Sequence, residues 1–104
     1  MFIVAPATAN TIAKLAHGFA DNMVTSTALA LPDNIPKLLA PAMNTKMFTH
    51  PATQANLKTL KSYGYEIISP KESLLACGDF GRGALADLEI IIERIKETLN
   101  EQTL

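Results

Sequence analysis

Three short apolar runs, separated by helical segments, constrain the fold of this chain more than any other feature. Residues 2–5, 37–40 and 65–68 predict strands, and a proline follows each run directly or one residue later. Because proline has no N–H to give to a sheet ladder, we expect each strand to end before it. The order strand–helix–helix–strand–helix–strand–loop–helix predicts a parallel sheet with helices on both faces.

Two helices are predicted between the first and second strands. Thr8 or Asn10 can cap the first helix. Its apolar face contains Ile12, Leu15, Ala16 and Phe19. Asp21 or Asn22 can cap the second helix, over residues 23–31, which carry no charge. Such a helix is typically buried all round, either inside the domain or against another subunit.

A third helix is predicted to begin at Pro51, with Thr49 or His50 as its cap. Leu57 and Leu60 lie on one face of this helix and should be buried. The prediction places the helix between the second and third strands.

The segment 71–84 is predicted to form a mobile or tightly turned loop, because it places Gly78, Gly81 and Gly83 within six residues. Long loops of this kind often act as lids. The last helix follows, and we expect residues 100–104 to be a frayed tail. The predicted apolar face of this helix is Leu85, Leu88, Ile92, Ile95 and Leu99.

Composition excludes several classes of function. The 104 residues are 48% apolar and carry a net charge of −1 without a basic or acidic run, so nothing indicates a nucleic-acid or membrane partner. Residues 1–6 lack the features of a signal peptide. The single cysteine, Cys77, fits a reducing cytoplasm. His17 and His50 are predicted to be capping or surface residues, and no cluster has the spacing of metal ligands.

Three predicted strands are fewer than the five or six of a usual doubly wound sheet. The chain is therefore either a small self-sufficient domain or the second half of a larger one. The first run already has the character of a central strand, which favours the larger domain.

Polar groups gather in three loops at strand ends: residues 6–11, residues 41–48 and the segment around Cys77. Asn44 can orient an anionic or planar ligand, or it can bond its own backbone in a turn. Cys77 is either incidental or a proton donor to a carbanion or enethiolate. Amides, hydroxyls and one thiol, without an obvious base, suit a bound organic cofactor that supplies the difficult chemistry.

These three loops resemble the motifs of the flavin-containing cysteine decarboxylases. Residues 6–11, Pro-Ala-Thr-Ala-Asn-Thr, resemble the family's P-A-S-A-N-T motif, with Thr8 keeping the hydroxyl of the serine. Residues 41–48, Pro-Ala-Met-Asn-Thr-Lys-Met-Phe, resemble P-x-M-N-x-x-M-W, with Phe48 in place of tryptophan. The segment Ala-Cys-Gly-Asp around Cys77 resembles the substrate clamp. The resemblance covers essentially the whole chain.

The resemblance implies a Rossmann-like or flavodoxin-like, three-layer α/β fold of which only the C-terminal part of the sheet is present. Residues 1–104 would be the C-terminal portion of a single flavoprotein decarboxylase domain. The implied cofactor is FMN, and the implied enzyme is a carboxy-lyase. The similarity is greatest to bacterial members that convert 4′-phosphopantothenoylcysteine to 4′-phosphopantetheine in coenzyme A biosynthesis.

The resemblance also implies roles for individual residues. Asn44 would bind the departing carboxylate and take part in catalysis, Met47 would shape the same pocket, and Cys77 would protonate the enethiolate. The substrate clamp around that cysteine would comprise Ala76, Gly78 and Asp79. The flavin-facing loop would comprise Thr8, Asn10 and Thr11. Weaker candidates for a flavin or subunit contact are Thr25 and Ser26.

The implied assembly is a homo-oligomer, a trimer or dodecamer, with the active site between subunits. The family's catalytic histidine and flavin-phosphate loop precede the matched part, and neither His17 nor His50 corresponds to that histidine. Residues 1–104 alone are therefore predicted to be inactive.

Three rival functions remain for such a chain. Related enzymes oxidatively decarboxylate the C-terminal cysteine of a peptide. Non-catalytic relatives regulate a protein phosphatase, but they usually carry long acidic tails, which are absent from this sequence. The flavin prenyltransferases share the fold but lack the P-x-M-N signature.

Overall fold

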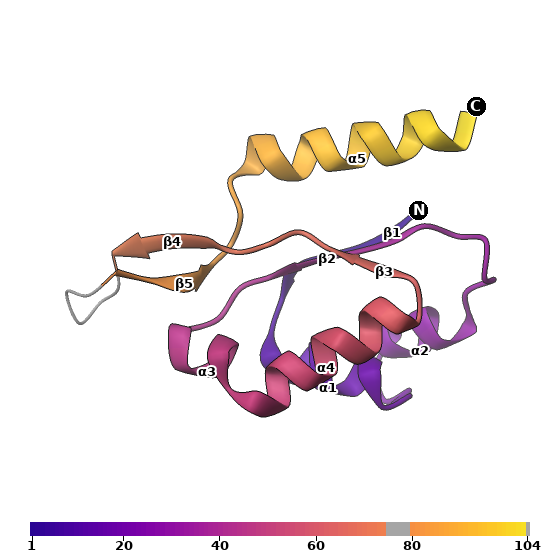
Figure 1. The fold of residues 1–104 in the computed structure, drawn as a ribbon. Helices are drawn as coiled ribbons and strands as arrows, with labels where there is room; N and C mark the ends of the chain where they lie inside the picture. Colours follow the sequence, from indigo (N-terminus) through magenta and orange to yellow (C-terminus); the bar gives the residue numbers. More distant parts are fainter. Residues whose placement is uncertain (75–79, 104) are drawn as a thin grey trace.

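The fold is a parallel sheet between two layers of helices (Figure 1). The structure is a computed structural model and describes residues 1–74 and 80–103. Three parallel strands lie side by side in the order β1-β2-β3. They are β1 (Phe2–Ala7), β2 (Lys37–Pro41) and β3 (Tyr65–Ile67). The predicted α/β class with helices on both faces is confirmed.

Four helices cover the two faces of the sheet. One face carries α1 (Ala9–Ala16), α2 (Met23–Ala30) and α4 (Pro51–Ser62), and the other carries α5 (Leu88–Thr103) (Figure 1). A short helix, α3 (Thr45–Thr49), follows β2. As predicted, His50 caps α4, because its Nδ1 accepts the N–H of Ala52 at 3.0 Å.

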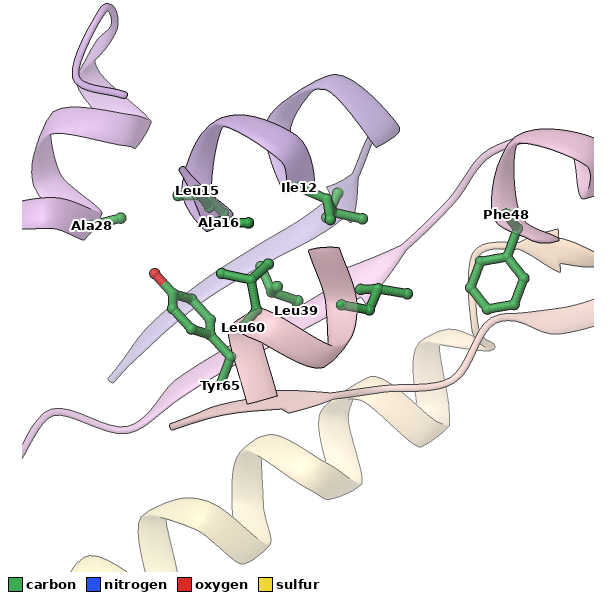
Figure 2. Close-up of a cluster of buried hydrophobic side chains, with 10 residues drawn as sticks. Ile12, Leu15, Ala16, Ala28, Leu39, Phe48, Leu60 and Tyr65 are labelled. Atoms are coloured by element: carbon green, nitrogen blue, oxygen red, sulfur yellow. The ribbon is translucent and has the colours of Figure 1, made fainter. Parts of the chain in front are cut away.

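The alternation of side chains along β2 divides the core into two clusters. Leu39 points toward α1 and α4, where it meets Ile12 and Leu60 (Figure 2). Leu38 and Ala40 point to the other face and pack beneath α5. The central strand thus joins both layers, and its apolar character at every inner position follows from being covered on both faces.

The prolines do not end the first two strands, contrary to the prediction. Strand β1 continues through Pro6 to Ala7 with a shift of register after Val4, and β2 continues through Pro41. Ladder bonding resumes beyond the second proline, since the N–H of Ala42 donates to the carbonyl of Ala7 at 3.0 Å. A proline at the end of a ladder leaves only its own position without a donor, which the strand tolerates.

The prediction of a loop over residues 71–84 is wrong for the described part of this segment. Its described parts make an antiparallel hairpin of β4 (Lys71–Leu74) and β5 (Phe80–Ala84). Glycine-rich sequence can form a strand where backbone must approach backbone closely. This is the situation of Gly83, whose φ is +140°.

Two helix boundaries also differ from the prediction. Helix α1 ends at Ala16, so Phe19 lies beyond it and is 52% exposed. Helix α5 runs to Thr103, so most of the predicted tail is helical.

The predicted burial of two helices is corrected as well. Within this chain α2 buries only Thr25 and Ala28, so burial all round inside the domain is wrong. The alternative, burial against another subunit, stays a prediction. In α5 the buried apolar residue is Ile91, which is not in the predicted apolar face, while Ile95 of that face packs partly buried against the same core cluster. None of the helices in the described ranges has the length and apolar character to cross a membrane.

Candidate active site

The first wall of the site is the turn from β1 into α1. Thr8 caps this helix, and its Oγ1 accepts the N–H of Thr11 at 3.2 Å. The two hydroxyls also bond each other at 3.2 Å. Asn10 lies exposed in the first turn of the helix. The turn therefore presents an amide and a helix start at the carboxyl edge of the sheet, where α/β proteins bind ligands.

The second wall is the loop after β2, and Asn44 organises it. Asn44 Oδ1 accepts the N–H of Met47 at 2.9 Å and so caps α3. This is the local turn bond that the sequence left as one alternative. The side-chain nitrogen of Asn44 makes no hydrogen bond with any described residue and is exposed. One end of the amide thus holds the loop, while the other can donate to a ligand.

Two neighbours of Asn44 complete this wall. Met47 is 45% exposed beside it. The hydroxyl oxygen of Thr45 is buried and has no hydrogen-bond partner in the described part of the chain. Buried hydroxyls are nearly always bonded, so this group is available to a bound molecule. Sequence reasoning did not single out Thr45, and only its place directly after Asn44 could have suggested it.

The third wall is the hairpin, which is fixed directly against the Asn44 loop. The N–H of Met43 donates to the carbonyl of Gly83 at 2.7 Å. A Cβ on Gly83 would lie 2.2 Å from the carbonyl oxygen of Met43, so only glycine permits this approach. Residues 75–79, with the candidates Ala76, Cys77, Gly78 and Asp79, lie outside the described residues. The sequence singled out Gly83 only as one of three loop glycines, and its contact with Met43 could not be predicted.

Thr25 and Ser26 are not brought to this edge. The Thr25 hydroxyl is used inside a capping box, where it accepts the N–H of Asn22 at 3.1 Å. Thr25 lines a surface cavity together with Lys37 and Tyr65, which begin β2 and β3. That cavity is at the amino ends of the strands, opposite the three loops.

The residues whose pKa values are shifted also lie away from the carboxyl edge of the sheet. A hydrogen bond from Lys14 holds the pKa of Asp21 below its usual value, and burial raises the pKa of Tyr65. His17 bonds Asn56 through Nε2 at 3.0 Å and is exposed, which confirms a surface role. The described residues contain no group of three potential metal ligands.

A family model described as Flavoprotein matches residues 1–100. The chain belongs to the Flavoprotein family. Two of the described walls, residues 6–11 and residues 41–48, carry motifs on which the resemblance to flavin-containing cysteine decarboxylases was based.

Individual members of the Flavoprotein family support this resemblance. A probable phosphopantothenoylcysteine decarboxylase of Streptococcus mutans is 64% identical over 99 residues, which cover 95% of this chain and 55% of the relative. A structure of a PPC decarboxylase with a cysteine-to-serine mutation, complexed with pantothenoylaminoethenethiol, is similar with a TM-score of 0.89 and 37% identity. The match covers 94% of this chain and 54% of the chain in that structure.

A third similar protein is the FMN-binding protein AtHal3, with a TM-score of 0.86 and 37% identity over 95% of this chain and 54% of that one. The chain thus spans about half the length of these similar proteins. Its flavodoxin-like fold agrees with theirs.

Proposed function

We propose that residues 1–104 are the C-terminal portion of a flavoprotein domain that decarboxylates 4′-phosphopantothenoylcysteine to 4′-phosphopantetheine. The observation that carries the proposal is the bond between Met43 and Gly83, which joins the Asn44 loop to the hairpin. This bond supports a common site for the Asn44 loop and the segment between β4 and β5. The identity of 64% to a probable enzyme of this specificity supports the substrate.

The polar groups at the carboxyl edge fit FMN as the cofactor. The orphaned hydroxyl of Thr45 and the unbonded amide nitrogen of Asn44 can be satisfied by a polar organic ligand. We propose that Thr8, Asn10 and Thr11 hold the flavin. When bound, FMN supplies the two-electron oxidation and reduction that turn the cysteine moiety into an electron sink and later restore it.

The residues of this chain would then handle the carboxylate and the proton. The amide nitrogen of Asn44 donates to the substrate carboxylate and orients it until the C–C bond breaks and CO2 leaves. Met47 and the clamp residues exclude water from the pocket. Cys77 would give its thiol proton to the carbon of the enethiolate. The hydride that converts the resulting thioaldehyde to the saturated thiol would come from the reduced cofactor.

We further propose that the enzyme is a homo-oligomer, a trimer or dodecamer, of the cytoplasm. The support is α2, which carries no charge and leaves Met23, Val24 and Leu29 exposed at 82%, 43% and 61%. An uncharged exposed helix is a natural subunit contact.

The function is tested in a single chain that joins residues 1–104 to the part of the Streptococcus mutans relative outside the match. This chimera is expected to bind FMN and to release CO2 from phosphopantothenoylcysteine. Residues 1–104 alone are expected to do neither. A folded, flavin-loaded chimera that leaves this substrate intact would refute the proposal.

A Cys77→Ser variant of the chimera separates the proposed reaction from its nearest rival. It is expected to release CO2 but to stop at the unsaturated enethiol, which mass spectrometry distinguishes from 4′-phosphopantetheine. Saturated product from this variant would exclude the role of Cys77. Turnover of a peptide ending in cysteine, in preference to phosphopantothenoylcysteine, would instead support the peptide decarboxylase.

A further inference from the structure

A cavity of about 560 Å³ lies at the amino ends of β2 and β3, at the opposite end of the strands from the Asn44 loop. This volume is within the range of cavities that bind small molecules. Helices α1 and α2 give the cavity an apolar floor, which includes the buried residues Leu15, Ala16 and Ala28. The floor can therefore take the hydrocarbon part of a ligand.

Tyr65 brings a hydroxyl without a partner to this cavity. The residue is only 8% exposed and lines the cavity from the start of β3. Figure 2 shows its oxygen at the end of the ring on the side of Ala28. The hydroxyl makes no hydrogen bond with any residue that the structure describes. Because buried tyrosine hydroxyls usually have a partner, this one is available to a bound molecule.

The register of the sheet places Lys37 beside Tyr65. The two residues are partners across β2 and β3, so their side chains lie on the same face of the sheet. The ammonium nitrogen of Lys37 is 6.0 Å from the centre of the Tyr65 ring. Lys37 is half-buried and forms no ion pair with another described residue. Its charge therefore favours an anionic ligand in the cavity.

Both of these polar groups are hydrogen-bond donors at neutral pH. Burial raises the pKa of Tyr65, which keeps the phenol protonated. The ammonium group of Lys37 has donors and no acceptor. A carboxylate has two oxygens that accept separately, so a single carboxylate can accept from both groups.

The rim of the cavity disfavours a second negative charge on the ligand. Asp33 lines the cavity from the turn before β2, is exposed, and has no ion pair in the part of the chain that the structure describes. Its carboxylate would repel a dianion. Phe19 and Tyr63, which are 52% and 58% exposed, add aromatic surface to the same rim. A monoanion with an aromatic body fits this combination.

We propose that the cavity binds a small aromatic monocarboxylic acid. The carboxylate accepts from the ammonium group of Lys37 and the hydroxyl of Tyr65, and the ring lies against the apolar floor. Binding at this end of the strands requires neither flavin nor the substrate of the proposed decarboxylation.

Phenylacetate is the probe for this site, and the chimera described above is the protein to titrate. Saturation-transfer NMR should show the ring protons of phenylacetate in contact with the protein, and calorimetry should give the dissociation constant. The neutral analogue phenylacetamide should bind about tenfold more weakly or worse. Absence of phenylacetate binding, or equal binding of the amide, would overturn the proposal.

A variant at the carboxyl edge distinguishes this site from the proposed active site. The Asn44→Asp chimera should bind phenylacetate as the parent does, and the absorption spectrum of bound FMN should not change during the titration. Loss of binding in Asn44→Asp would place the acid at the carboxyl edge and overturn the proposal. A chimera that binds phenylacetate but no flavin would refute the proposed cofactor and leave this site intact.

Paired substitutions locate the carboxylate. Tyr65→Phe and Lys37→Met should each weaken phenylacetate binding by about tenfold. The controls are Tyr63→Phe, which removes a hydroxyl from an exposed residue, and Lys61→Met, which removes a charge from α4 outside the cavity. All four changes nearly keep the side-chain volume, so circular dichroism should show folded chains. Equal losses in a variant and its control would overturn the assignment.

Phenylmalonate tests the preference for one negative charge, because it carries the same ring and a second carboxylate. The parent chimera should bind phenylmalonate more weakly than phenylacetate, and Asp33→Asn should reduce that difference. Tighter binding of phenylmalonate or of inorganic phosphate than of phenylacetate would overturn the proposed class of ligand.

Discussion

At the level of single residues, Asn44 does two things with the two ends of one amide. Its oxygen caps α3 through the N–H of Met47, and its nitrogen is left for a ligand. Such a residue cannot be tested by simple deletion, because removing the side chain removes the cap and the donor together. The two roles separate only when the oxygen is kept and the nitrogen is replaced.

Asn44→Asp makes this separation. Aspartate caps helices as well as asparagine does, so the urea midpoint should stay near that of the parent chimera. Activity should be lost, because a second carboxylate repels that of the substrate. Asn44→Ala should lose activity and also about 1 kcal/mol of stability. Decarboxylation by Asn44→Asp at the parent rate would rule out the proposed donor role.

Gly83 is the second residue at which the structure makes a sharp prediction. Gly83→Ala places a methyl group against the Met43 carbonyl and breaks the bond between hairpin and loop. We expect a loss of more than about 2 kcal/mol in urea unfolding.

Gly64→Ala is the matched control for this substitution. Gly64 has a φ of +95° but nothing within 4 Å of a Cβ, so its substitution should cost only about 1 kcal/mol of backbone strain. Equal losses at the two glycines would show that the contact with Met43 contributes nothing.

At the level of elements, the sequence predicted the existence of strands and helices well and their surroundings poorly. The apolar face of the last helix was placed at Leu85, Leu88, Ile92, Ile95 and Leu99 because spacing reveals an amphipathic stripe. Spacing cannot show how much of this face the chain itself covers: Leu85 and Ile95 pack against the core, whereas the other three residues are exposed. The hairpin was missed because β4 and β5 lack period-two alternation, and glycine normally weakens a strand.

The link between α1 and the start of α2 gives a pH-dependent prediction. Lys14 holds the pKa of Asp21 low in the folded chain. The associated stability is therefore present above the unfolded pKa, about 4, and is lost as the pH falls through the lower folded value. Asp21→Asn should unfold at lower temperature than wild type at pH 6, and the difference should vanish in strong acid.

Asp33→Asn serves as the control, because Asp33 makes no ion pair among the described residues. Its melting temperature should follow wild type across the same pH range. A difference between Asp21→Asn and wild type that persists at the lowest pH would mean that the ion pair is not its source.

At the level of the whole molecule, a chain with both an open sheet edge and an exposed uncharged helix has two separate surfaces to cover. β1 is an edge strand among the described residues, and α5 lies on the face of the sheet opposite to α2 (Figure 1). Leu88, Ile92 and Leu99 of α5 are exposed. Completion of the domain and assembly of subunits should therefore be independent steps.

This independence can be measured in the flavin-loaded chimera. Leu29→Glu on α2 should reduce the oligomer to smaller species by light scattering, while the domain itself stays folded. Ile90→Glu, exposed on α5, is the control and should leave the mass unchanged. An unchanged oligomer with Leu29→Glu would exclude α2 as the subunit contact.

The sequence led to the right edge of the sheet for the site but not to its geometry. Parallel strands were enough to bring the turn at Thr8 and the loop at Asn44 together. No local pattern could show that Met43 and Gly83, far apart in sequence, share a hydrogen bond, or that the Thr45 hydroxyl is left without a partner. Those features arise only when the backbone of one segment meets another.

The bond between Met43 and Gly83 has a practical consequence, because its donor is a single backbone amide. Whenever the hairpin leaves the Asn44 loop, that N–H is released to solvent. The NMR signal of this amide therefore reports whether the hairpin of β4 and β5 contacts the Asn44 loop. Following this one resonance during a titration with substrate would show the contact forming or breaking, without any label attached to the protein.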